Sequence, residues 1–106
     1  MPTIQFFQPD EGRHFEGPLD LNAHLIRHPA ATFFLRAGPD VPAPDGAGRR
    51  DAGVRADDLL VIDRSVRPSL GTVIIAVHDG ELRVERFRHE ETLEVWGAVT
   101  HLIRRL

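Results

Sequence analysis

Few side chains in this sequence are able to act as nucleophiles or general bases, because its 106 residues include neither lysine nor cysteine. Without cysteine there are no disulfides, thiolate nucleophiles or thiolate metal sites. Its two serines, Ser65 and Ser69, fall in a polar connection where the local sequence places no general base beside them. Because a positioned base contributes orders of magnitude to the rate, we expect neither serine to be a nucleophile.

Six histidines raise the question of a metal site. His24 and His28 stand four residues apart, a spacing that puts two imidazoles on one helix face and can chelate zinc. The helix there is short, Pro29 follows directly, and the pattern fixes no third ligand. We therefore predict no metal site and no cofactor. His101 alternates onto the apolar face of the last strand, which favours a hydrogen-bonded core or interface residue.

The charge balance is 13 arginines against 16 acidic residues, a formal net charge of -3. Direct nucleic-acid binding needs clustered positive charge, so this balance argues against it. No stretch approaches the ~18 consecutive apolar residues of a membrane helix, and the first eight residues lack the basic start and apolar run of a signal peptide. The sequence is thus typical of a cytoplasmic protein that does not contact membranes.

The elements that must position these residues are mostly short strands. Strand patterns cover residues 32–37, 59–63, 72–77, 82–87 and 92–103. The last strand alternates, with Leu93, Val95, Val99 and Ile103 on its apolar face and Trp96 opposite. Asp79-Gly80 predicts a two-residue hairpin, and Gly97 marks a bend where the sheet curls. We predict a mainly β fold, a small curled antiparallel sheet or barrel.

Two irregular segments and one helix complete the organisation. Residues 1–19 are expected to form an extended N-terminal arm, followed by a single domain over residues 20–106. A short helix is predicted from Asp20 to Arg27, capped by Asp20 or Asn22 and stopped by Pro29. Residues 38–57, rich in proline and glycine, predict a long mobile loop that is either functional or disordered.

This order of segments resembles the UmuD branch of the LexA-like self-cleaving peptidases. The matching blocks are DLN (20–22), HPAATFFLRA (28–37), DLLVIDRS (58–65), GTVIIA (71–76), DGELRV (79–84) and VWGAVTHLIRRL (95–106). Four or more blocks in the right order are far more specific than any one of them. The resemblance implies a curled antiparallel β fold, in agreement with the strand pattern.

The resemblance also implies a serine–lysine dyad, and both of its positions differ here. In the family a serine nucleophile follows the first strand, and a desolvated lysine takes its proton. Asp40 keeps its place in that turn, but Val41 stands at the serine position and Glu85 at the lysine position. We therefore predict a pseudo-peptidase with no catalytic residue. Asp40 and Glu85 would form a carboxylate pair if the strands met as in the family; a solvated or arginine-paired remnant is the favoured interpretation.

Two further departures concern processing and the sheet. The family's cleavable bond, after Cys or Ala and before Gly, has only Glu11-Gly12 and Glu16-Gly17 as counterparts, so the arm resembles a form that is already processed. About twenty residues expected before the last strand are reduced to residues 88–90. Exposed strand edges left there, together with the last strand, are expected to associate with partners by strand pairing.

On this basis we expect a catalytically inactive, UmuD-like accessory protein that acts by binding in the SOS response and translesion DNA synthesis. The implied partners are a second copy in a homodimer, an error-prone DNA polymerase subunit and the RecA filament. Trp96, as an interface anchor or second-core residue, and the pair Arg49 and Arg50 in the long loop are the candidate partner-binding residues. Two alternatives stay open. One is a hydrolase using Asp40, Glu85 or a noncognate serine, and the other is a dimerisation module that antagonises an active paralogue.

Overall fold

The computed structural model describes residue 3 and residues 20–43, 52–88 and 94–106. The predicted arm, apart from Thr3, lies outside these residues. So do the middle of the predicted loop, with Arg49 and Arg50, and most of the shortened connection before the last strand.

Within the described residues five strands form one antiparallel sheet. The strands are β1 (Thr32–Arg36), β2 (Leu59–Asp63), β3 (Val73–His78), β4 (Glu81–Arg86) and β5 (Glu94–Ile103). They lie side by side in the order β1-β2-β5-β3-β4, so β1 and β4 are the edges. The prediction of a mainly β, antiparallel fold is confirmed.

The predicted helix is present but shorter than expected. Helix α1 spans Leu21–Leu25, and the carboxylate of Asp20 caps it by accepting hydrogen bonds from the backbone N–H groups of Asn22 and Ala23. The helix ends before Arg27 because Ile26 is already extended and a separate 3-10 turn begins at Pro29. Proline suits the first position of such a turn, where its missing N–H costs nothing.

The hairpin between β3 and β4 forms as Asp79-Gly80 predicts. Both residues have positive φ, 50° and 81°, which a two-residue turn requires if its twist is to match that of the strands. Val73 to His78 then pairs in register with Arg86 to Glu81.

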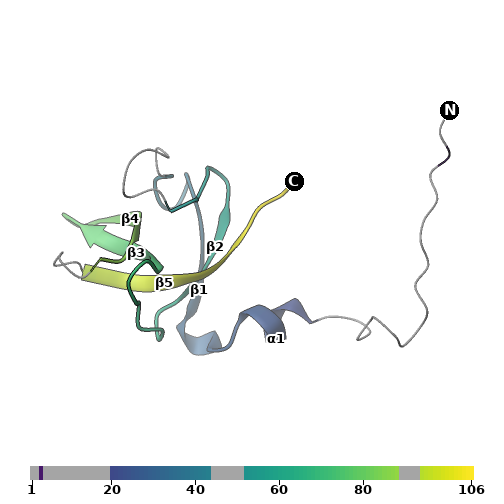
Figure 1. The fold of residues 1–106 in the computed structure, drawn as a ribbon, viewed down its shortest axis with the longest axis horizontal. Helices are drawn as coiled ribbons and strands as arrows, with labels where there is room; N and C mark the ends of the chain where they lie inside the picture. Colours follow the sequence, from purple (N-terminus) through teal and green to yellow (C-terminus); the bar gives the residue numbers. More distant parts are fainter. Residues whose placement is uncertain (1–2, 4–19, 44–51, 89–93) are drawn as a thin grey trace.

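Strand β5 joins two halves of the sheet. Its first half pairs with β3 and its second half with β2, with Ala98 facing both neighbours. Figure 1 shows β5 as one long curved strand with β3 and β4 along its beginning and β1 and β2 beside its end. Gly97 lies at the crossover, where a Cβ atom would come within 2.5 Å of the Ile62 Cγ2 methyl. Close packing against Ile62 therefore explains why glycine, and not a residue with a Cβ atom, stands at the position predicted to bend the sheet.

The predicted alternation along β5 is wrong for Trp96. The register passes from Ile75 opposite Gly97 to Ala76 opposite Val95, which leaves Trp96 as an extra residue in β5. Such a bulge switches the face on which later side chains lie. As a result Trp96 and Val99 both pack against the same buried cluster, rather than lying on opposite faces.

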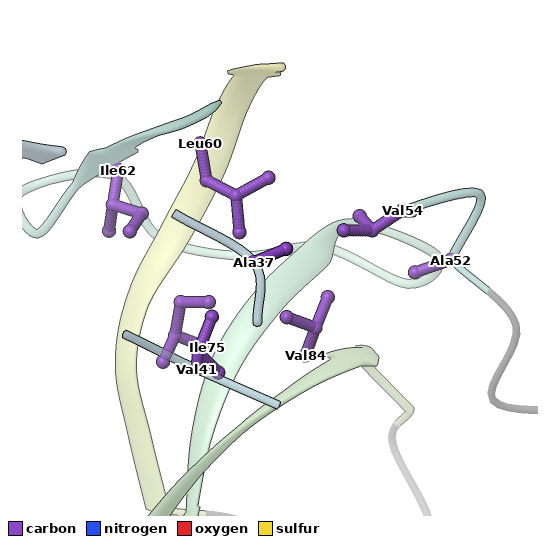
Figure 2. Close-up of a cluster of buried hydrophobic side chains, with 8 residues drawn as sticks. All are labelled: Ala37, Val41, Ala52, Val54, Leu60, Ile62, Ile75 and Val84. Atoms are coloured by element: carbon purple, nitrogen blue, oxygen red, sulfur yellow. The ribbon is translucent and has the colours of Figure 1, made fainter. Parts of the chain in front are cut away.

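That cluster is the core on one side of the sheet. It comprises Ala37, Val41, Ala52, Val54, Leu60, Ile62, Ile75 and Val84, and Figure 2 shows their side chains converging between the strands. Three of these residues come from the segment predicted to be a mobile loop. At the described ends of that segment Val41, Ala52 and Val54 are buried and pack against the sheet; the mobility of the segment stays a prediction.

Candidate functional site

The turn after β1 fixes the position of Val41. Gly38 adopts a φ of 103°, and its N–H donates to the Val41 carbonyl at 2.7 Å. The Asp40 carboxylate accepts a hydrogen bond from the Arg36 N–H at 2.7 Å, which closes the turn from the other side. The Val41 side chain consequently points into the core and is 0% exposed. The structure thus places a fully buried, purely apolar side chain at this position.

Glu85 is buried as well, 3% exposed, but in different surroundings. On β4 its neighbour Val84 pairs with Ile75 and belongs to the cluster that contains Val41. Because side chains alternate along a strand, Glu85 projects to the other face, beside Ile74. There its Oε1 lies 2.8 Å from Nε2 of His78. The approach is close, but it lacks the alignment of a hydrogen bond to Nε2.

The predicted carboxylate positions therefore serve different purposes. Asp40 is exposed and caps its own turn, whereas Glu85 is enclosed next to His78. Of the two remnant interpretations, the solvated one is wrong for Glu85, since almost none of its surface meets water; the arginine-paired one stays a prediction. The face of β4 on which it lies is set by the register with β3, which the residue types alone do not reveal.

Ser65 and His28 meet at the buried carboxylate of Asp63. The Ser65 hydroxyl and N–H donate to Oδ1 at 2.6 and 2.9 Å, and Nδ1 of His28 lies 2.5 Å from Oδ2. Chiefly because of the Ser65 hydroxyl, and next because of His28, the pKa of Asp63 is lowered to about 2. Ser65 is thus a partner of a structural carboxylate. His28 is likewise engaged, so it is not paired with His24 as the i,i+4 spacing allowed.

Ser65→Ala is expected to raise the pKa of Asp63 from about 2 towards the unperturbed ~3.9. In the wild type the folded pKa lies below the unfolded one, so this carboxylate stabilises the fold fully above pH ~3.9 and loses that effect as pH falls through about 2. In Ser65→Ala this stabilising effect of the Asp63 carboxylate should be lost at a higher pH than in the wild type. Carbon-detected NMR titration of the Asp63 carboxyl measures the shift. Ser69→Ala, which removes a hydroxyl bonded to Thr72, is the control; an unchanged Asp63 pKa in Ser65→Ala contradicts the assignment.

The prediction for His101 is confirmed in part. His101 is hydrogen-bonded as predicted, through Nδ1 and the Thr100 hydroxyl at 3.0 Å. His101 is exposed, however, so the prediction that it lies in the core is wrong. The register shift at Thr100 explains the exposure: Val61 pairs with His101, but the next residue of β2, Ile62, pairs with Val99. In the part of the chain that the structure describes, no three His, Asp or Glu side chains group closely enough to hold a metal ion.

Trp96 is half-buried between a ring and a guanidinium. Its ring centroid lies 5.3 Å from that of Phe33 at a tilt of 60°, and the Arg64 guanidinium carbon lies 4.5 Å above the indole. The Arg64 Nε also donates to the Trp96 carbonyl at 2.7 Å. Trp96 thus packs against the main core and not against a second core on the other face. Its role as an interface anchor stays a prediction; the ring that it contacts, Phe33 on edge strand β1, is 42% exposed.

An ion pair between a buried carboxylate and a partly exposed guanidinium was not anticipated from the sequence. Asp58, 1% exposed, accepts hydrogen bonds from Arg104 at 2.8 Å (Nε to Oδ1) and 2.6 Å (NH2 to Oδ2). These bonds lower the pKa of Asp58 and raise that of Arg104. The same Asp58 carboxylate accepts from the Arg55 N–H at 2.8 Å. The only sequence signal was an aspartate directly before a buried strand, and its partner stands 46 residues away.

Comparison with known proteins finds similarity over most of the chain. ImpA from Salmonella typhimurium is 39% identical over 109 aligned positions, covering 85% of this chain and 70% of ImpA. MucA from Escherichia coli is 30% identical, covering 78% of this chain and 66% of MucA. The LexA repressor of Idiomarina loihiensis is 31% identical over a shorter alignment, 71% of this chain and 33% of the repressor. No family model matches the chain. Among the described residues, no helix has the length and apolarity to cross a bilayer.

Proposed function

Because the chain belongs to the UmuD-like family of SOS mutagenesis proteins, relatives of the LexA peptidases, we propose that it is a member without self-cleavage that acts by binding other proteins. The observation that carries this proposal is the side chain at the nucleophile position. Val41 has no hydroxyl and no exposed surface, so it offers neither an attacking atom nor access for a peptide bond.

The position of the general base supports the same conclusion. The family's mechanism, as the resemblance implies it, needs a neutral lysine, and the sequence contains none. Glu85 stands at that position and projects away from the Val41 cluster, towards His78. The two remaining serines are unsuited to replace the nucleophile, since Ser65 is bonded to Asp63 and Ser69 to Thr72. Serine catalysis without an adjacent base would forgo the activation that the reaction requires.

Binding is the role that the retained fold can still perform. The last strand lies inside the sheet, between β2 and β3. Its pairs with β3 nevertheless reach only to Ala98, so the stretch 99–103 pairs on the β2 side alone among the described residues. That open stretch suits strand addition by a second copy or another chain. We propose a homodimer that engages an error-prone DNA polymerase subunit and the RecA filament, with Trp96, Arg49 and Arg50 as contact residues.

The test is self-cleavage and binding measured on the same preparation. Incubated with RecA assembled on single-stranded DNA and a nucleotide, the protein is expected to keep its full mass by mass spectrometry. A family member that retains the serine and lysine, processed in parallel, is the positive control. The same sample should sediment as a dimer and co-purify with an error-prone DNA polymerase subunit that is co-expressed with it.

Two outcomes would overturn the proposal separately. A shortened chain would show that self-cleavage persists, and its new terminus would locate the bond. A protein that keeps its mass but neither dimerises nor binds the polymerase subunit or RecA would remain an inactive peptidase fold, and the accessory role would be wrong.

A further inference from the structure

Three neighbouring strands end at the same side of the sheet. Since β1-β2-β5 are antiparallel neighbours, the end of β1, the beginning of β2 and the end of β5 meet there. The pairs Arg36 with Leu59 and Leu59 with Ile103 mark the line of contact. A cleft of about 620 Å³ opens at this end. Its volume is within the ~300–1,000 Å³ that ligand sites occupy.

Each of the three strand ends that form this cleft has at least one arginine on it or near it in the lining. The lining arginines are Arg36, Arg55, Arg104 and Arg105. Against them stand the carboxylates of Asp57 and Asp58, so the lining side chains carry an excess of two positive charges in a chain whose formal net charge is -3. The sheet topology has therefore gathered positive charge that is spread along the sequence.

Two of these arginines are already engaged in hydrogen bonds within the chain. Arg104 is held by Asp58 and by the Gly53 carbonyl, and the Arg36 guanidinium donates to the Asp57 carbonyl at 2.8 Å. The guanidinium groups of Arg55 and Arg105 make no hydrogen bond or ion pair with the described residues, and both residues are exposed. Their donors are available to a ligand. A guanidinium fork is well suited to a carboxylate because it offers two parallel N–H groups.

The remaining wall of the cleft is apolar. It includes Leu59, Ile103 and Leu106, and the Ile103 side chain is 45% exposed. Among the described lining residues there is no aromatic side chain, and stacking on aromatic rings is what single-stranded nucleic-acid sites use. A second copy placed symmetrically over the cleft would bring the same positive charges together, which is unfavourable. A protein segment that carries carboxylates next to an apolar side chain matches this lining better than a nucleic acid or a second copy of the chain does.

We propose that this cleft binds an acidic segment of a partner protein, with carboxylates on Arg55 and Arg105 and an apolar side chain against Ile103. The inference names the partner chemistry for the binding role proposed above and rests on that role. Of the open stretch of β5 only Ile103 lines the cleft, so residues 99–102 stay free when the cleft is occupied.

A fluorescein-labelled peptide with acidic residues on both sides of a leucine tests the site by fluorescence anisotropy. The full chain is expected to bind it, and Arg55→Gln with Arg105→Gln should weaken binding roughly tenfold, as expected for two exposed charge pairs. Raising the salt concentration should weaken binding further. The matched control is Arg67→Gln with Arg83→Gln, which removes the same charge from exposed residues on the connection after β2 and on edge strand β4; its affinity should equal that of the wild type.

Three results would overturn the inference. The first is equal binding of a peptide with amides in place of the carboxylates, and the second is equal loss of binding in both double variants or in neither. The third is tighter binding of a single-stranded oligothymidylate that the Arg55/Arg105 variant abolishes, which would assign the cleft to nucleic acid. None of these affects cleavage, dimerisation or RecA binding, so failure here leaves the proposed function standing. A processed chain would in turn leave the cleft result unchanged.

Discussion

Gly97→Ala is expected to lower the free energy of unfolding by about 2 kcal/mol, the middle of the range for overpacking a core. The new methyl would lie 2.5 Å from the Cγ2 of Ile62 and 3.2 Å from the Cγ of Arg64. Ile62 is fully buried, and its branched Cβ restricts the rotation that would move this methyl away. The general gain from replacing glycine with alanine, ~0.5–1 kcal/mol, is smaller than this cost. Urea denaturation measures the change.

A double-mutant cycle identifies the clash as the cause. In an Ile62→Ala background the offending methyl is gone, so Gly97→Ala should cost at least about 1 kcal/mol less than in the wild type. Ile62→Val keeps a methyl at Cγ2, so in that background the cost should persist. Equal costs in all three backgrounds would exclude close approach of β5 to Ile62 as the reason for glycine.

Asp58→Asn is expected to destabilise the protein by roughly 3 kcal/mol, because it removes the charge of a buried carboxylate from its pair with the partly exposed Arg104 and weakens the charge-assisted hydrogen bonds that this carboxylate accepts. Asp58 is 1% exposed and accepts two hydrogen bonds from Arg104 and one from the Arg55 N–H. Chemical denaturation at neutral pH gives the difference. Arg104 is partly exposed and regains some hydration in the variant, which sets the value at the lower end of the range for buried pairs.

The neighbouring Asp57→Asn is a matched control for this variant. Asp57 is exposed, and it adopts a φ of 70° that asparagine tolerates as well as aspartate does. Its replacement should change stability by less than ~0.5 kcal/mol. Equal effects of the two substitutions would show that the ion pair contributes nothing specific.

The Asp58 effect also has a defined pH dependence. Arg104 holds the pKa of Asp58 below its ordinary value, so the folded pKa lies below the unfolded one. The carboxylate therefore stabilises the fold above the unfolded value of ~3.9, and this contribution disappears as pH falls through the lower folded pKa. The difference between wild type and Asp58→Asn should shrink in acid. A constant difference down to full protonation would mean that the charge of Asp58 is irrelevant.

The local elements of the fold were predictable because their causes are local. Asp20 caps a helix through its own side chain, and Asp79-Gly80 permits positive φ at both turn positions, so short stretches of sequence suffice for α1 and the β3–β4 hairpin. The apolar run 59–63 became β2 with the predicted bounds. Element ends were less predictable, since the end of α1 depends on how the chain enters the 3-10 turn at Pro29.

Side-chain surroundings were less predictable because they depend on register. A single extra residue opposite β3 places Trp96 on the core side, and another shift at Thr100 leaves His101 exposed. Asp58 and Arg104 bind each other across 46 positions, a separation over which no local pattern carries information. Glu85 could be aligned by its neighbours, but whether it met water was decided by the sheet that encloses it.

The residue types alone decide which chemistry is absent. No lysine occurs anywhere in the 106 residues, so no lysine side chain of this sequence can act as a base, whatever its fold. That valine and glutamate stand at the two dyad positions is what the resemblance to the family implies. Only the tertiary structure decides the surroundings of those positions: Val41 is sealed among Ile75 and Val84, and Glu85 faces His78 on the other side of β4. It also decides that arginines distant in sequence share one cleft. The reason is physical: covalent identity belongs to each residue, whereas burial and proximity arise only when strands pair.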